Sequence, residues 1–534
     1  MTYSFQDFQN GDVPPKGWDC ADAIRDGWTI EDIEGFMRAT VKPWVPPTPE
    51  AHAAPLAGPS KTMPRTAIEA AATEPRRSLI LDRRDPMPSA RALIADSYTI
   101  GNIVTMHHYR GGFYSWNGAC YEHVDQDAVN AEIWRFLEWS LHATKEETKP
   151  FQPTRARVGD VFSALAAASN LPAVIEAPVW LADSRDMPPA DEFLAVSNGL
   201  LHLASGDLHP ATPAYFGLNA SGVAYDPDAP EPTKWLKFLG QVWPDDPQSI
   251  EALQDLFGYL LSPDTSQQKI GLIVGPKRSG KGTIARVLTA LLGQSSVAQP
   301  TLASLAMNFG IAPLIGKSLA IISDARLSAK ADQAAIAERL LSISGEDALT
   351  IDRKFQSAWT GRLGARFLIF TNEIPRIADA SGALASRFVV LTMCQSFYGK
   401  EDRGLGKRLI GELSGILNWA LDGYRRLRER GYFTQPDSAQ DAVSELAELG
   451  SPITTFLKEK CTVAPGGQVA PMALYREWVE WCAANGRSTA GSKQTFGRDL
   501  RSAVAGLKMS HPRTDGGRER YYEGIALKNC PSEF

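Results

Sequence analysis

The stretch Gly271-Leu-Ile-Val-Gly275-Pro-Lys-Arg-Ser-Gly280-Lys281-Gly282-Thr283 decides the fold of the central part of this chain. A short apolar segment leads into a glycine-rich turn and a lysine, and a helix-forming run follows at residues 284–292. This order of strand, turn and helix has the G-x-x-x-x-G-K spacing of a Walker A motif. Glycines let backbone N–H groups turn toward phosphate oxygens, and the helix N-terminus adds the positive end of its dipole. The stretch therefore predicts a phosphate-binding loop.

The predicted loop supplies the candidate ligands of ATP and Mg²⁺. We assign to ATP binding Gly275, Pro276, Lys277, Arg278, Ser279, Gly280, Lys281, Gly282 and Thr283. Lys281 is expected to reach the β- and γ-phosphates. Gly282 departs from the consensus, which has a Ser or Thr directly after the lysine. The hydroxyl-bearing residue here is Thr283, one position later. The Mg²⁺ ligand is therefore either Thr283 or a water, and the Gly-Lys-Gly-Thr string, which small nucleotide kinases also carry, does not choose the reaction.

Length and composition bound the class of protein. A chain of 534 residues exceeds a single hydrophobic core, and 44% hydrophobic with 22% charged residues is ordinary for a soluble protein. There is no apolar run of about 18 residues and no N-terminal secretory pattern, so we expect neither a membrane span nor export. The six cysteines form no C-x-x-C pair, which argues against a zinc site or a disulfide framework and suits a reducing cytoplasm.

Composition and periodicity divide the chain into parts. The predicted parts are an acidic, tryptophan-bearing piece at 1–40, a Pro/Ala-rich linker at 41–78, a mixed α+β domain at 79–262, a nucleotide-binding domain at 263–430 and a small basic domain at 450–530. Alternating apolar strands and helices in the fourth part predict an α/β fold with a parallel sheet.

The mixed domain has its own local signals. We expect a β-hairpin at 109–118 and helices at 128–143, 153–168 and 235–261, the last of which ends at Ser262-Pro263. The pair His107-His108 has no third ligand nearby, so we interpret it as structural rather than metal-binding.

Three polar residues stand at the ends of later apolar strands, in the order that a nucleotide hydrolase needs. Asp324 ends the strand-like run from Ser318, in the form of a Walker B motif that would hold Mg²⁺. Asn372 ends a second strand and could orient the attacking water. Arg387 stands just before a third strand, which suits an arginine finger. Singly they could be a helix cap, a turn residue and a surface ion pair, but together behind the loop they favour catalysis.

A second hairpin is predicted between the Asp324 and Asn372 motifs. It runs from Leu349 to Trp359, with Arg353, Lys354 and Phe355 near its tip. Two cations beside an aromatic ring can follow a phosphate backbone and stack on a base. A charged, solvent-facing hairpin without a ligand remains the alternative.

The ordered motifs resemble the phage- and plasmid-encoded primase–helicases, whose motor is a superfamily-three helicase related to poxvirus replication ATPases. The resemblance covers residues 190–530. It rests on Asn198-Gly-Leu-Leu-His-Leu, Leu253-Gln-Asp-Leu-Phe-Gly-Tyr-Leu-Leu261, Ile322-Ser-Asp-Ala-Arg326, Phe370-Thr-Asn-Glu-Ile-Pro375 and Glu412-Leu-Ser-Gly-Ile-Leu-Asn-Trp-Ala-Leu421, in addition to the loop.

The resemblance implies an AAA+-like hexameric ring that hydrolyses ATP between subunits and moves 3′–5′ on single-stranded and forked DNA. Lys281, Thr283, Asp324 and Asn372 would belong to one site, and Arg387 would enter from the next subunit. Arg353 and Lys354 match the DNA-gripping hairpin. Ala325 stands where many relatives carry a second acid, so either Asp324 or Glu373 would activate the water.

The ends of the chain complete this interpretation. Residues 487–528 hold nine Lys or Arg against four acids, and helices are expected at 452–461, 473–485 and 491–505 with wing strands at 518–525. This order is typical of a winged helix, with Lys493, Arg498 and Arg501 on the DNA-reading helix. A winged helix that serves protein contacts is the alternative.

No primase catalytic domain is evident, so priming would come from a separate primase or polymerase, or from a part lost or cut away. A loader ring without unwinding activity and a nucleotide kinase remain as alternative functions.

Overall fold

The computed structural model describes residues 79–528, with short gaps, together with Thr29 and Asp32. The gaps are residues 182–186, 326–331, 355, 378, 380–381, 486–489, 512, 515–516 and 519. Contacts between residues separate Met1–Thr73 from Glu74–Phe534, and nearly all described residues belong to the second unit. Apart from Thr29 and Asp32, the predicted piece at 1–40 and the linker at 41–78 lie outside the described residues, as do Phe355 and Arg326.

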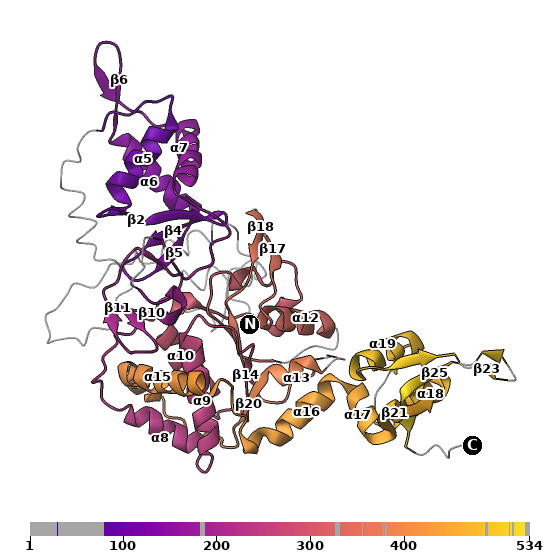
Figure 1. Cartoon of the computed structure of the whole chain (residues 1–534). Helices are drawn as coiled ribbons and strands as arrows, with labels where there is room; N and C mark the ends of the chain where they lie inside the picture. The colour runs from indigo at the N-terminus through magenta and orange to yellow at the C-terminus, as the bar shows by residue number, and fades with distance from the viewer. Residues whose placement is uncertain are drawn as a thin grey trace. The chain divides into compact units, whose positions relative to one another are not determined.

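In the part of the chain at residues 86–171, three helices pack on one face of a four-stranded sheet (Figure 1). The helices are α5 (Pro86–Ser97), α6 (Gln126–Glu138) and α7 (Arg155–Ala168), and the sheet has the order β5–β4–β3–β8, formed by Tyr121–Val124, Gly112–Trp116, Met106–Tyr109 and Asn170–Leu171. Met106 and Phe113 join the helices in one apolar cluster, whereas Tyr109 and Tyr121 pack with Phe216 in another. The hairpin predicted at 109–118 is confirmed as β3 and β4.

The helix predicted at 128–143 is shorter than expected. Helix α6 ends at Glu138, and Leu141–Ala143 forms strand β6, which pairs with β7 (Thr148–Pro150). The hydroxyl of Ser140 donates to the carbonyl of Phe136 at 2.8 Å, and such side-chain bonds compete with helix continuation.

A small β-rich segment follows. It contains the sheet β10–β11–β12 (Phe193–Val196, Gly199–His202 and Leu208–His209) and the pair β9 and β13 (Val179–Trp180 and Tyr215–Phe216). The single helix predicted at 235–261 is wrong: α8 spans Thr233–Val242 and α9 spans Pro247–Leu261. Pro244 and Pro247 break the run, because proline lacks the N–H that a continuing helix needs.

A five-stranded parallel sheet forms the centre of the chain (Figure 1). Its order is β15–β16–β19–β14–β20, from Val297–Ala298, Leu319–Ile322, Arg366–Thr371, Ile270–Val274 and Phe388–Thr392. Successive side chains point to opposite faces. Ile321 and Leu391 therefore join one apolar cluster, whereas Ile322 and Val390 join another.

Helices cover both faces of this sheet. One face carries α8, α9, α10 (Lys281–Leu292) and α15 (Leu413–Arg430), and the other carries α11 (Leu302–Leu305), α12 (Gln333–Ser344), α13 (Ala383–Arg387) and α16 (Gln440–Gly450). Helix α14 (Leu405–Ile410) lies against α10. Strands β17 (Leu349–Arg353) and β18 (Gln356–Gly361) form the predicted second hairpin.

The C-terminal helices lie close to their predicted bounds. They are α17 (Pro452–Lys460), α18 (Pro471–Ala484) and α19 (Lys493–Ala503). A three-stranded sheet, β21–β25–β22, joins Cys461–Val469, Tyr521–Leu527 and Lys508–Ser510. Phe456, Trp478 and Phe496 pack these helices together through ring contacts. Strand β21 was not predicted.

Candidate functional site

The loop at residues 275–283 is a tight turn between β14 and α10. Arg278 and Gly280 take left-handed conformations, with φ of 61° and 103°, and the chain reverses before α10 begins at Lys281. Gly275 allows a close approach, because a Cβ there would lie 2.6 Å from Met393 Cβ. The first backbone N–H groups of a helix have no partner within the helix. The loop therefore ends at the hydrogen-bond donors of the first turn of α10 and at the positive end of its dipole.

Lys281 is held inside this turn. Its Nζ donates hydrogen bonds to Gly275 O at 2.6 Å, Pro276 O at 2.7 Å and Ser279 Oγ at 3.1 Å. Burial lowers the pKa of Lys281. The charged side chain is thus pre-positioned by three oxygen acceptors rather than extended into solvent.

The first turn of α10 contains an arrangement that the motif did not predict. Arg286 donates from its guanidinium to Thr283 Oγ1 at 3.1 Å. The space beside Gly282 is open, since the nearest atom to an added Cβ would be Arg286 NH1 at 3.7 Å. A spacing of three residues on a helix brings side chains together, so helical periodicity could have indicated this pair.

The parallel sheet brings the ends of three strands to the same edge. Gly275 follows β14, Asn372 follows β19 and Asp324 lies two residues beyond β16. Since β19 lies between β14 and β16, Asn372 stands between the loop and Asp324 in the order of the strands. Gly275 N donates to Thr371 O at 3.2 Å, which ties the loop directly to the β19 end. Asp324 is exposed and Asn372 is half-buried.

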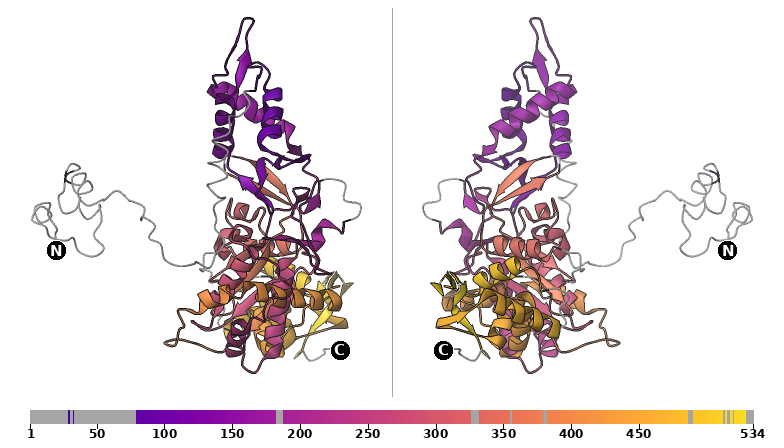
Figure 2. Two further views of the ribbon diagram at one scale, coloured as in Figure 1. Left: turned by 90° about the vertical axis from the view of Figure 1, so that its left-hand side faces the viewer. Right: turned by 90° about the vertical axis from the view of Figure 1, so that its right-hand side faces the viewer.

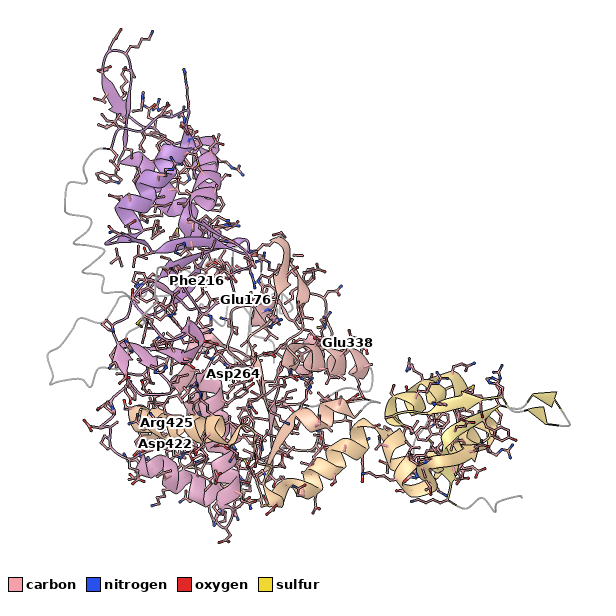
Figure 3. All side chains as sticks on the ribbon, in the orientation of Figure 1. Glu176, Phe216, Asp264, Glu338, Asp422 and Arg425 are labelled. Carbon is pink, nitrogen blue, oxygen red and sulfur yellow. The ribbon has the colours of Figure 1, made fainter. Side chains whose placement is uncertain are left out.

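Arg387 lies at the opposite edge of the sheet. It ends α13 and directly precedes β20, whose first residue pairs with the first residue of β14. Arg387 NH1 donates to Ser344 Oγ at 3.3 Å. The arginine lines a shallow hollow with three acidic residues, Glu338, Asp347 and Asp379; Figure 3 labels Glu338 on α12.

The β17–β18 hairpin packs on the turn between β3 and β4 (Figures 1 and 2). Arg353 NH2 donates to Arg110 O at 3.3 Å, and Arg353 Nε donates to Ser357 O at 3.0 Å. The guanidinium of Arg110 lies 5.3 Å from the centre of the Trp359 ring and pairs with Glu176 at 2.7 Å. Arg353 therefore contacts the N-terminal layer, whereas Lys354 is exposed at the turn of the hairpin.

Three of the cations predicted for DNA contact lie on α19. Lys493, Arg498 and Arg501 are all exposed, and Arg498 pairs with Asp499 at 3.2 Å. Ser492 caps the helix by accepting a hydrogen bond from Thr495 N.

The described residues contain no group of three His, Cys, Asp or Glu side chains that could hold a metal ion, and none of their helices is long and apolar enough to cross a membrane. His107 makes a ring contact with Tyr121, and His108 makes one with Phe113.

Two family descriptions match separate parts of the chain. The description "D5 N terminal like" matches residues 92–244, and "Family of unknown function (DUF5906)" matches residues 273–387. The chain carries a D5 N-terminal-like region. This agrees with the resemblance to the phage and plasmid primase–helicases. The D5-like region contains the β3–β4 turn that holds Arg353, and the second match contains the loop, Asp324 and Asn372.

Two solved structures are also similar. The A form apo structure of the NrS-1 C terminal region aligns with a TM-score of 0.45 and 12% identity, over 82% of this chain and 100% of that chain. A second apo structure of that region aligns with a TM-score of 0.46 and 11% identity, over 83% of this chain and 100% of that one.

Proposed function

We propose that this chain is an ATP-dependent DNA helicase that serves the replication of a phage, prophage or plasmid in the host cytoplasm. The observation that carries the proposal is the set of strand ends at one edge of the parallel sheet. The 275–283 loop, Asn372 and Asp324 follow β14, β19 and β16. Ligands of open α/β sheets bind at the carboxyl ends of the strands.

In this proposal the loop is a P-loop that binds ATP. The N–H groups at the start of α10 and the Lys281 ammonium group bind the phosphates. Thr283 Oγ1 and the Asp324 carboxylate supply oxygen donors, which are the ligands that Mg²⁺ prefers. Mg²⁺ neutralises charge on the phosphates when it is bound. Asn372 orients the attacking water, with Asp324 or Glu373 as its base.

We further propose a hexameric ring in which Arg387 completes the site of the next subunit, and in which Arg353, Lys354 and Phe355 bind single-stranded DNA. The C-terminal helices α17–α19, with β21, β22 and β25, would form a winged-helix domain. Lys493, Arg498 and Arg501 would contact the phosphates of forked DNA there. A separate primase or polymerase would supply primers.

The decisive experiment measures ATP hydrolysis with and without single-stranded DNA, and displacement of a labelled strand from a tailed duplex. We expect hydrolysis that DNA stimulates and that Lys281→Ala abolishes. Hydrolysis without strand displacement would favour a loader ring. Transfer of the γ-phosphate to a nucleoside monophosphate would instead show a nucleotide kinase and overturn the proposal.

A further inference from the structure

A cleft lies between the D5-like region (residues 92–244) and the edge of the parallel sheet where its strands begin, opposite the 275–283 loop. It consists of an outer hollow of about 410 Å³ and an inner hollow of about 140 Å³. The two hollows are adjacent, because both are lined by Tyr114, Leu218, Ile315, Gly316 and Lys317. Residues 275–283 contribute nothing to the lining of either hollow.

Positive charge gathers along this cleft. Lys317 lies where the hollows meet, and its Nζ donates to Ser295 O at 2.6 Å. Arg353 and His123 line the outer hollow, and Arg362 lines the inner one. Within the part of the chain that the structure describes, Lys317, Arg353 and Arg362 have no ion pair.

Two acids also line the cleft, Glu122 in the outer hollow and Glu176 in the inner one. The charge of Glu176 is balanced by its ion pair with Arg110. A fourth cation, Arg366, also lines the inner hollow and has no ion pair among the described residues. Glu122 alone therefore stands against four unpaired cations, and the cleft favours an anion.

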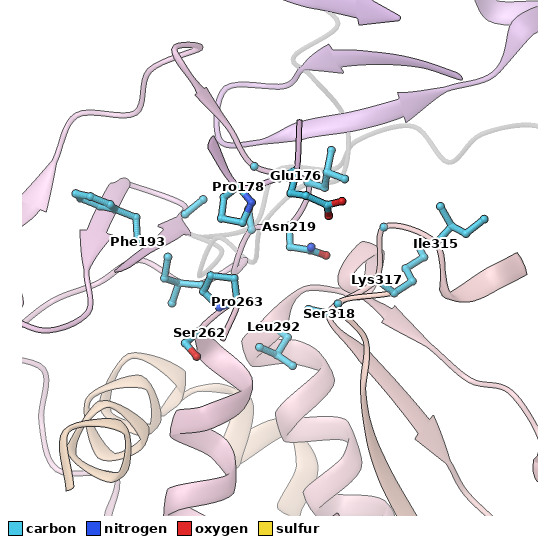
Figure 4. A pocket seen from close by; sticks show the side chains of 18 of the residues that line it. Glu176, Pro178, Phe193, Asn219, Ser262, Pro263, Leu292, Ile315, Lys317 and Ser318 are labelled. Atoms are coloured by element: carbon cyan, nitrogen blue, oxygen red, sulfur yellow. The ribbon is translucent and has the colours of Figure 1, made fainter. Parts of the chain in front are cut away.

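The inner hollow holds a polar group without a partner. Asn219 Oδ1 is buried and accepts no hydrogen bond from any described residue. Figure 4 shows Asn219 between Glu176 and the segment that carries Lys317 and Ser318. Apolar walls surround it, formed by Pro178, Phe193, Pro263 and Leu292. Buried amides normally find a partner, so this one is suited to a ligand that brings a donor.

We propose that this cleft binds single-stranded DNA, with backbone phosphates on Lys317 and Arg353 and one unstacked base in the inner hollow beside Asn219. A base presents N–H donors at its edge and a flat apolar face, which match the amide and the apolar walls. Tyr114 is half-buried and lines both hollows, and its aromatic ring would provide a stacking surface. This inference rests on the proposed function, because the same β17–β18 hairpin borders the cleft.

The first test uses the full chain without ATP and a fluorescein-labelled single-stranded oligodeoxynucleotide, with affinity measured by anisotropy over a range of salt concentrations. Lys317→Gln should weaken binding about tenfold and lower the slope of log affinity against log salt by about 0.7, the value for one lost phosphate contact. The matched control is Lys149→Gln, which removes an exposed lysine of β7 that lies outside the cleft and pairs with Glu147. It should bind like the wild type.

The second test uses Asn219→Leu. Because Asn219 Oδ1 accepts no hydrogen bond within the described part of the chain, this variant should keep the thermal midpoint of the wild type. Its affinity for single-stranded DNA should nevertheless fall several-fold. Its affinities for oligo(dT), oligo(dA) and oligo(dC) should become equal, and the slope of log affinity against log salt should not change. If Lys317→Gln and Asn219→Leu both bind the oligonucleotide with the affinity of the wild type, the proposal is overturned.

Displacement of the oligonucleotide by free dTMP at equal nucleotide concentration would also overturn it, because the cleft would then be a mononucleotide site. These measurements need no ATP hydrolysis. Their failure is therefore distinguishable from failure of the proposed helicase, which the Lys281→Ala assay decides.

Discussion

Arg387 and Lys281 lie at opposite edges of the same parallel sheet. Lys281 begins the helix that follows β14, whereas Arg387 directly precedes β20, the neighbour of β14. A five-residue strand spans about 16 Å, which is beyond the reach of one arginine side chain that packs toward Ser344. Within one subunit, Arg387 is therefore turned away from its own loop. In the ring that we propose, the equivalent arginine of a second copy would complete the site.

This arrangement predicts complementation between two inactive variants. Lys281→Ala should not hydrolyse ATP because it lacks the phosphate-binding cation, and Arg387→Ala should bind ATP without hydrolysing it. A mixture of the two forms some interfaces that join an intact loop to an intact Arg387. Hydrolysis by the mixture, measured as phosphate release, should exceed that of either variant alone.

An Arg387→Ala protein with full activity would show that the arginine has no part in hydrolysis. Two inactive variants that stay inactive when mixed, although light scattering shows that they assemble together, would contradict donation between subunits.

The contact between Arg286 and Thr283 predicts an effect on the Mg²⁺ requirement. A guanidinium 3.1 Å from Thr283 Oγ1 opposes a second cation at that oxygen. Arg286→Gln should lower the Mg²⁺ concentration for half-maximal ATP hydrolysis about two- to fivefold, as expected for an exposed charge contact of roughly 0.5–1 kcal/mol. An increased Mg²⁺ requirement would instead indicate that Arg286 helps to bind the phosphates.

Alanine substitution at two helical glycines should change the free energy of unfolding in opposite directions. A Cβ at Gly258 in α9 would lie 2.2 Å from Tyr424 N of α15, whereas a Cβ at Gly240 in α8 would meet no atom within 4 Å. Gly258→Ala forces the helices apart and should lower the free energy of unfolding by about 1–3 kcal/mol. Gly240→Ala should raise it by roughly 0.5–1 kcal/mol, because alanine favours helix. Thermal and urea unfolding would measure both.

Arg366 is predicted to be a structural cation at the start of β19. It is buried and donates to the carbonyls of Tyr259, Leu260, Ser262, Asp264 and Ser318. Burial lowers its pKa, and no ion pair compensates it within the described parts of the chain. Arg366→Met should destabilise the fold by about 3–5 kcal/mol, since several buried carbonyls at the end of α9 lose their donor. A melting temperature like that of the wild type would contradict this role.

The sequence predicted features that depend on local patterning. The strand, turn and helix around Lys281, both hairpins and the three C-terminal helices follow from residue spacing and turn chemistry. The break between α8 and α9 was missed because helical periodicity outweighed two closely spaced prolines. Strand β21 was missed because its sequence, with Pro465, Gly466 and Gly467, is unfavourable for a strand, yet it pairs with β25 through an irregular register.

The sequence by itself determined the strand, the glycine-rich turn and the helix around Lys281, and it predicted the residues for phosphate and metal binding, because these depend on residue type and on spacing along one strand and one helix. Only the tertiary structure decided which of them meet. The strand order brings the loop, Asn372 and Asp324 to one edge and sends Arg387 to the other. It also brings Arg353 onto the Arg110 turn and leaves Asn219 Oδ1 in a cleft without a hydrogen-bond partner among the described residues. These relations join residues up to 243 positions apart, and they depend on packing that no local pattern records.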